Sequence, residues 1–279
     1  AAFDGGGITF APTQPGGIAS SIWGALTDSF SGSYSNAAIS MSPNGDLMLA
    51  SYFDVEAGYP LYKGHLLAWN IDNDPTSANF GEILPGTGPF NTVWDGGQLL
   101  ASRTASGSET NQGTFSQQDR RNGYTAKAAM AMFSDPLPFD SSSLGAGTDL
   151  TTLLIDEVSI ASNPTCATLP HDFDFDCDSD YDDAQIMVDF LRGVATSNFM
   201  HTGTPRGPWK MGDTGRATAV VAPSEINAIA LEQHFRNYRF KLGQLPSVAY
   251  ITSNSGQVHA FNIDAGSVTQ GSELWFYMP

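Results

Sequence analysis

The chain has 279 residues, of which 41% are hydrophobic and only 15% are charged, so it can fold around a sizeable core. Its 29 acidic residues outnumber the 12 basic ones, and the formal net charge is −17 at pH 7. This charge repels the phosphates of nucleic acid, so we expect no nucleic-acid partner; cation binding or simple solubility is its natural consequence.

The sequence contains no apolar run of about 18 residues, so no membrane span is expected. The first residues, Ala1-Ala2-Phe3, form no signal peptide and indicate a processed N-terminus or a fragment boundary. We therefore expect an extracellular or cell-surface location. The two cysteines, Cys166 and Cys177, could form a disulfide, but two cysteines alone do not identify a compartment.

Short apolar runs between turn residues predict β-strands in the first hundred residues. The strongest local signal is Asn44-Gly45, because both residues tolerate the left-handed backbone of a hairpin turn. Short strands at regular spacing are typical of an antiparallel sandwich or propeller. The predicted strands are 37–41, 47–53, 65–71, 92–95 and 98–102.

The middle of the chain is more polar. Residues 103–124 are expected to form a long surface loop, followed by a short strand near 126–133 and a β-rich segment at 150–160. Two short helices are predicted later. The first runs from Asp182 or Asp183 to Leu191 and ends at Gly193; the second, Glu225–Tyr238, follows an N-cap at Ser224.

Seven aspartates lie within the twelve residues 172–183, and six of them have the spacing of an EF-hand-type calcium loop. Such a loop takes side-chain oxygens at positions 1, 3, 5, 9 and 12 and a backbone carbonyl at position 7. Two positions depart from the motif: Cys177 replaces the turn glycine, and an aspartate replaces the final glutamate. The sequence thus predicts Ca²⁺ as the cofactor. The predicted ligands are Asp172, Asp174, Asp176, Asp178, Asp180 and Asp183.

An alternative interpretation of the same segment is a solvated acidic loop held by a Cys166–Cys177 disulfide, and both interpretations can hold together. A disulfide of this loop length would contribute about 2–3 kcal/mol.

No nucleotide-binding, serine-hydrolase or zinc-protease motif occurs in its required context. The five histidines are scattered, with no pair at the spacing of a zinc-binding helix, and we expect them to be structural. The sequence therefore predicts no catalytic residue and no enzyme activity. The histidines are His65, His171, His201, His234 and His259.

The C-terminal segment of the chain, residues 246–279, resembles the signature propeller blade of the PilY/PilC family of type IV pilus tip-associated proteins. Weaker matches follow the family's order at 64–70, 94–99, 188–193 and 210–223. Ser255 stands where the family pattern has an aspartate. The matched positions are Tyr250, Asn254, Gly256, His259, Ala260, Phe261, Glu273, Leu274, Trp275, Tyr277 and Pro279.

The resemblance implies a mainly β fold: antiparallel sheets of a partial quinoprotein-like β-propeller, with two short helices. It implies a non-catalytic, extracellular role in type IV pilus assembly or tip adhesion. The expected partners are pilus or filament subunits and a surface ligand. The chain is expected to divide into three parts. Residues 1–160 form a β-rich lobe, residues 161–212 form a joint that contains the disulfide, the acidic loop and a helix, and residues 213–279 form a blade-like lobe.

In the family the greater part of the propeller follows the position of Pro279. The chain is therefore expected to be a fragment, or to have its open sheet completed by strands of other chains. Two further hypotheses stay open: a structural subunit of an extracellular filament assembled through open β-edges, and a fragment of a quinoprotein-like dehydrogenase.

Overall fold

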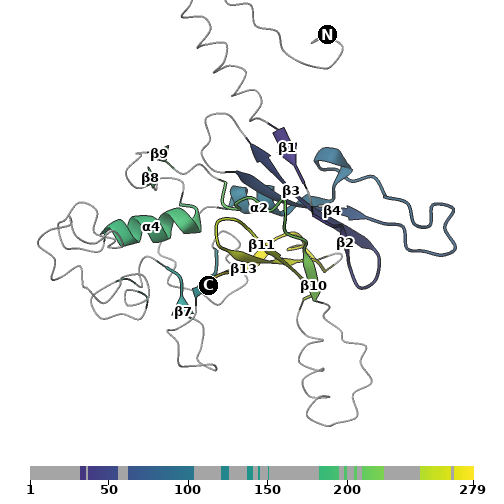
Figure 1. Ribbon diagram of the computed structural model, residues 1–279. Helices are drawn as coiled ribbons and strands as arrows, with labels where there is room; N and C mark the ends of the chain where they lie inside the picture. The colour runs from purple at the N-terminus through teal and green to yellow at the C-terminus, as the bar shows by residue number, and fades with distance from the viewer. Residues whose placement is uncertain are drawn as a thin grey trace, which may run out of the picture.

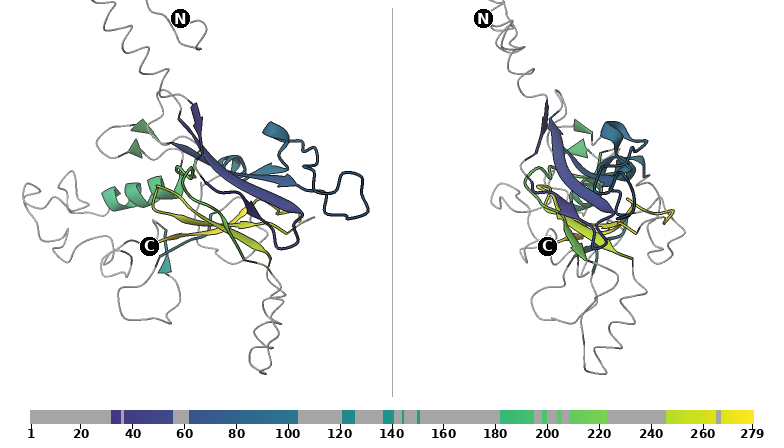
Figure 2. Two further views of the ribbon diagram at one scale, coloured as in Figure 1. Left: turned by 45° about the vertical axis from the view of Figure 1, so that its right-hand side comes forward. Right: turned by 90° about the vertical axis from the view of Figure 1, so that its right-hand side faces the viewer.

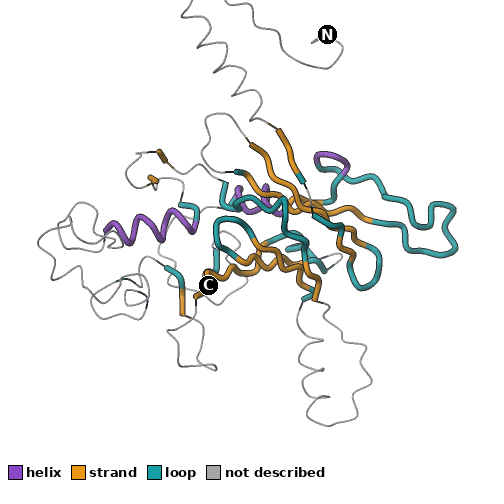
Figure 3. The backbone as a smooth tube through the Cα atoms, viewed as in Figure 1, coloured by secondary structure: helices purple, strands orange, loops and turns teal. Residues whose placement is uncertain are grey.

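The described part of the chain is mainly β (Figure 1). It contains two larger sheets, a two-stranded sheet and two α-helices (Figure 3). No helix in it is long and apolar enough to cross a membrane. The computed structural model describes residues 32–35, 37–55, 62–103, 121–125, 137–140, 144, 150, 182–194, 198–199, 204–205, 209–222, 246–264 and 267–279.

The first large sheet, here called the N-terminal sheet, is antiparallel throughout. Its strand order is β1-β3-β4-β5, with β2 pairing β3. In the central strand β3, burial alternates from Leu47 to Ser51, because side chains on a strand point to opposite faces in turn, whereas its partner β4 is buried on both faces from Gly64 to Ala68. The strands are β1 (Gly32–Tyr34), β2 (Ser40–Met41), β3 (Leu47–Val55), β4 (Lys63–Asn70) and β5 (Trp94–Asp95).

The hairpin predicted around Asn44-Gly45 is confirmed by the pairing of β2 with β3. Its turn is wider than a two-residue loop, because the Ser42 amide donates to Leu47 O at 2.8 Å. Only Gly45 has a left-handed backbone in this turn, with φ of 73°.

The strand predicted at 98–102 is wrong, because these residues belong to helix α2 (Gly96–Ser102). Asp95 caps the helix by accepting hydrogen bonds from the amides of Gly97 at 2.9 Å and Gln98 at 3.3 Å. A Cβ at Gly97 would lie 2.3 Å from Gly64 O, so glycine is required where the helix passes β4. A 3₁₀ turn, η1 (Pro89–Asn91), precedes β5.

The second large sheet, here called the C-terminal sheet, begins with four consecutive antiparallel strands. They are β10 (Val220–Ala222), β11 (Val248–Thr252), β12 (Val258–Asn262) and β13 (Glu273–Met278). Beyond β13 the sheet continues with β6 (Gly123–Thr125), which runs parallel to β13, and then with β7 (Leu137–Pro138).

Part of the loop predicted at 103–124 is therefore wrong. Gly123 and Tyr124 lie in β6, and Arg121 beside them is only 1% exposed. Because β6 and β7 come from the first 160 residues, strands from both sides of the expected lobe boundaries share one sheet.

The helix predicted from Asp182 or Asp183 is confirmed as α4 (Asp182–Arg192). Gly193 ends it with φ of 89°. The Gly193 amide donates to Phe190 O, and the Val194 amide donates to Asp189 O. These two hydrogen bonds are the pair that defines a Schellman motif. A short two-stranded sheet follows, formed by β8 (Asn198–Phe199) and β9 (Thr204–Pro205).

The two large sheets pack against each other (Figures 1 and 2). Side chains of one parity on each sheet form the core between them, and we call these the inner faces. On the C-terminal sheet, a second cluster around Phe139, Val188 and Phe276 lies near α4 and β7. The inter-sheet core contains Leu47, Leu49, Leu66, Ala68, Trp94, Leu100, Met211, Ala219, Ala249, Ile251, Phe261 and Ile263.

Three predicted elements lie outside the described residues: the helix Glu225–Tyr238, the strand near 126–133 and the β-rich segment 150–160 apart from Leu150.

Candidate functional site

Most of the residues predicted to bind calcium or to form the disulfide lie outside the described part of the chain: Asp172, Asp174, Asp176, Asp178, Asp180, Cys166 and Cys177. Asp183 lies in the first turn of α4, where the backbone alone is described. Among the described residues, no group of three or more His, Cys, Asp or Glu is placed to hold a metal ion. The calcium loop and the disulfide stay predictions.

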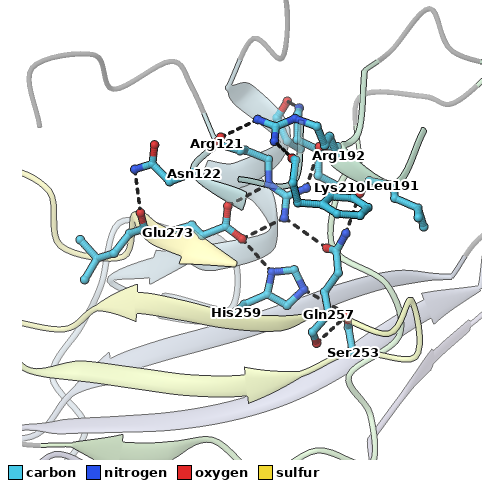
Figure 4. A network of polar contacts seen from close by, with 12 residues as sticks. Arg121, Asn122, Leu191, Arg192, Lys210, Ser253, Gln257, His259 and Glu273 are labelled. Atoms are coloured by element: carbon cyan, nitrogen blue, oxygen red, sulfur yellow. Dashed lines mark hydrogen bonds and ion pairs between the residues drawn. The ribbon is translucent and has the colours of Figure 1, made fainter. Parts of the chain in front are cut away.

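A buried polar network lies on the inner face of the C-terminal sheet (Figure 4). Its members come from four separate segments, and none exposes more than 3% of its surface. We use the name buried network for Arg121, Arg192, Gln257, His259 and Glu273.

Glu273 is the centre of the buried network. Arg121 donates to both of its carboxylate oxygens, from Nε at 2.8 Å and from Nη2 at 3.0 Å. His259 Nδ1 lies 2.7 Å from Oε1. Burial alone would raise the pKa of the Glu273 carboxyl, but the Arg121 charge and the hydrogen bonds from His259 and Arg121 hold that pKa well below its ordinary value. The carboxylate therefore stays ionised inside the protein.

The same network ties the end of α4 to the sheet. Arg121 Nη1 donates to Arg192 O at 2.6 Å, and Arg192 Nη2 returns a hydrogen bond to Arg121 O at 2.7 Å. Gln257 Nε2 donates to Leu191 O at 2.6 Å, and Arg192 also donates to Phe139 O. Carbonyls at a helix end have no partner within the helix, so Arg121 and Gln257 replace the partners that α4 lacks.

Ser253 extends the network into an arrangement that resembles a catalytic triad. Its Oγ lies 3.0 Å from His259 Nε2, and His259 Nδ1 contacts Glu273. Three observations favour a structural role. His259 is fully buried, Arg121 balances the Glu273 charge, and Ser253 Oγ also bonds Ser255 Oγ at 2.7 Å.

The sequence alone did not indicate the roles of Arg121, Arg192 and Gln257. His259 and Glu273 were among the matched positions of the pilus-family resemblance, but without an assigned contact. Arg121 lies 152 residues from Glu273 in sequence, so no local pattern reports their pairing. The one usable signal was the match at 188–193, which contains Arg192.

A second polar group lies on the opposite, outer face of the N-terminal sheet. The register pairs Tyr52 with His65 and Asp54 with Lys63, so all four side chains share that face. Phe90, Asp95 and Trp209 join them. We use the name outer-face cluster for Tyr52, Asp54, Lys63, His65, Phe90, Asp95 and Trp209.

His65 is held from four sides within this cluster. Its Nδ1 lies 2.6 Å from Asp95 Oδ2, and its Nε2 lies 3.3 Å from Asp54 Oδ2. The Tyr52 ring stacks on the imidazole at 4.2 Å, and the Trp209 ring lies at 4.6 Å. Burial, with the nearby Asp54 and Asp95 charges, raises the pKa of the Tyr52 hydroxyl far above its ordinary value. Tyr52 is therefore a neutral hydroxyl at physiological pH.

Phe90 has an unusual backbone in this cluster. Phe90 and Asn91 both have left-handed φ angles, of 59° and 60°. Such a conformation costs about 1–2 kcal/mol for a residue other than glycine. Trp69 Nε1 fixes the turn by donating to Phe90 O at 3.0 Å.

No family model matches the chain, and no curated protein and no solved structure shows significant similarity to it.

Proposed function

We propose that this chain is a non-catalytic, extracellular protein associated with type IV pili, acting in pilus assembly or in adhesion at the pilus tip. The observation that supports the proposal best is the way the family-like segment folds. Strands β11, β12 and β13 form one antiparallel meander, with the matched positions distributed along it.

The matched positions have clear structural tasks in that meander. Gly256 makes the β11–β12 turn with φ of 81°. Ala260 and Phe261 are fully buried, and Tyr250 packs against Trp275 at 5.7 Å on the other face. His259 and Glu273 contact each other in the buried network. A pattern whose residues serve packing and internal pairing favours a scaffold over a catalyst.

We further propose that the two large sheets are neighbouring blades of a partial quinoprotein-like propeller. Among the described strands, β10 to β13 are four antiparallel neighbours in one sheet, which is the number of strands in a propeller blade. The N-terminal sheet packs on the inner face of that blade, as adjacent blades do. The addition of β6 and β7 beyond β13 departs from an ordinary four-stranded blade.

Calcium and the Cys166–Cys177 disulfide belong to the same proposal. The acidic residues 172–183 lead directly into α4, and the other end of α4 is held by Arg121 and Gln257. A Ca²⁺ ion bound there would fix the start of a helix whose end is already fixed. This placement supports a stabilising role for the ion.

The location can be tested on the cells that make the protein. An antibody against the chain is used to probe shear fractions and whole cells by immunogold labelling, beside cells that lack assembled pili. We expect the protein in the sheared pilus fraction and its loss from the surface of the cells without pili. Confinement to the cytoplasmic fraction would rule out the proposal.

The alternative, a filament subunit joined through open β-edges, has one observation in its favour. Among the strands that the structure describes, β10 lies at one edge of the C-terminal sheet, near β2, where Ser40 donates to Ala219 O. Ile39, Met41 and Val220 are exposed there. The alternative predicts concentration-dependent assembly in light scattering that a Val220→Lys substitution abolishes; a monomer at all concentrations would contradict it.

A further inference from the structure

We propose that the outer-face cluster binds a neutral saccharide, with a sugar ring stacked in the corner between Phe90 and Tyr52. The proposal rests on the geometry of the N-terminal sheet and not on the pilus assignment. It supplies a ligand class for a surface that the fold leaves on the side opposite to the core.

The corner is built from two rings at right angles. Phe90 and Tyr52 have centroids 6.4 Å apart and an interplanar angle of 87°. Tyr52 is in turn backed by His65, and His65 by Trp209, so the inner wall of the corner is rigid. An apolar ring face bounded by an aromatic wall is the kind of surface on which the C–H face of a sugar packs.

The backbone strain at Phe90 is difficult to explain by stability. The residue has a left-handed conformation, yet 70% of its surface is exposed. Burial of the ring therefore offsets little of the cost of the strain. Strained residues that present exposed side chains are concentrated at binding sites, where a fixed geometry is needed before the ligand arrives.

The charges of the cluster favour an uncharged ligand. Asp54 and Asp95 both contact His65, and Lys63 stands opposite Asp54 in the register of the two strands. Lys63 Nζ also lies 5.8 Å from the centroid of the Trp209 ring. The cation–π position on this ring is therefore already taken by Lys63 and does not call for a cationic ligand. A free cationic ligand would meet Lys63, and a free anion would meet Asp54.

Hydrogen-bonding groups on the same face suit a ligand rich in hydroxyls. Asp54 lies two residues after Tyr52 on the outer face of β3, and its side chain, 34% exposed, can accept from a hydroxyl. Tyr52 stays a neutral hydroxyl that can donate or accept. A neutral sugar is bound by aromatic rings that pack on its C–H groups and by polar groups that hydrogen-bond its hydroxyls. The outer-face cluster offers both.

The test uses the full chain on an array of neutral, anionic and cationic oligosaccharides, followed by calorimetry with the best neutral saccharide. Phe90→Ala and Asp54→Asn should each weaken binding about tenfold or more. Phe80→Ala, which removes a similarly exposed phenylalanine (59%) outside the cluster, should leave it unchanged. Phe90→Gly removes the ring and relieves the left-handed strain, so its Tm should equal or exceed that of the wild type.

Four results would overturn the proposal. In the first, the wild type binds no neutral saccharide on the array more strongly than Phe90→Ala does. In the second, the wild type and Phe90→Ala have equal affinity in calorimetry. In the third, the wild type binds only charged glycans, and in the fourth, Phe90→Gly has a clearly lower Tm than the wild type. The last would make the ring a structural element. None of these outcomes bears on the presence of the protein in a pilus fraction, so the two proposals fail separately.

Discussion

The ion pair between Arg121 and Glu273 is the most demanding contact in the described residues. Two charges in a water-free interior lose much solvation, and they are tolerated only when paired and fully hydrogen-bonded. Glu273 meets this condition with two bonds from Arg121 and one contact with His259. Arg121 also stacks over Phe276, with the guanidinium carbon 4.1 Å from the ring centroid. Loss of either charge should therefore be costly.

We expect Glu273→Gln to lower the free energy of unfolding by about 3–5 kcal/mol, because the Arg121 charge would stay buried without its counter-charge. Urea denaturation followed by circular dichroism measures the loss. Glu82→Gln, at an exposed glutamate in a loop, is the control and should change stability by less than about 0.5 kcal/mol. A loss of under about 1 kcal/mol for Glu273→Gln would contradict the role given to the pair.

The same carboxylate should give the fold a specific pH dependence. The pKa of Glu273 is lower in the folded protein than its ordinary value of 4.5, so the unfolded chain binds the proton more readily. Its contribution is fully present above pH 4.5 and is lost as the pH falls below that value. Tm measured from pH 7 down to pH 3 should fall more steeply in the wild type than in Glu273→Gln, and parallel curves would exclude this origin.

At the scale of elements, glycines and caps decide where the helices begin and end. Asp95 starts α2 and at the same time contacts His65, so one carboxylate serves both the helix and the outer-face cluster. Gly193 ends α4 beside Lys210, whose Nζ donates to Ala101 O in the last turn of α2. The ends of the two helices are thus connected through a single lysine.

Gly193→Ala should destabilise the protein more than Gly45→Ala, although both glycines are left-handed. An added Cβ at Gly193 would lie 2.4 Å from Lys210 Cγ, whereas nothing lies within 4 Å of a Cβ at Gly45. Gly45→Ala should therefore cost about 1 kcal/mol from backbone strain alone, and Gly193→Ala should cost that amount plus the displacement of Lys210. Equal losses in urea denaturation would show that Lys210 moves without penalty.

At the scale of the whole molecule, the C-terminal sheet is the meeting point of the chain. It takes strands from residues 123–138 and 220–278, packs on the N-terminal sheet, and receives the end of α4 through the buried network. On the inner face of this sheet, the buried network lies between the inter-sheet core and the cluster around Phe139, Val188 and Phe276. Any ligand that stabilises the start of α4 should therefore stabilise the whole fold.

Calcium is the ligand expected to do so. Addition of Ca²⁺ in place of a chelator should raise the Tm, by about 2–4 °C for each kcal/mol of binding free energy. Asp174→Asn combined with Asp176→Asn should abolish the rise, whereas Asp74→Asn, at an exposed aspartate outside the acidic loop, should leave it intact. A wild-type Tm that is equal in Ca²⁺ and in chelator would remove the ion from the proposed function.

The sequence by itself determined the local features. A short apolar run after turn residues predicted β3, and glycines predicted the β2–β3 hairpin and the end of α4, because these structures depend on neighbours within a few residues. Only the tertiary structure decided that 98–102 is a helix, that β6 runs parallel to β13, and that Arg121 is buried against Glu273. β13, the parallel partner of β6, and Glu273, the partner of Arg121, lie about 150 residues away, and α2 packs against the earlier strand β4. Such long-range contacts leave no periodic trace in the chain.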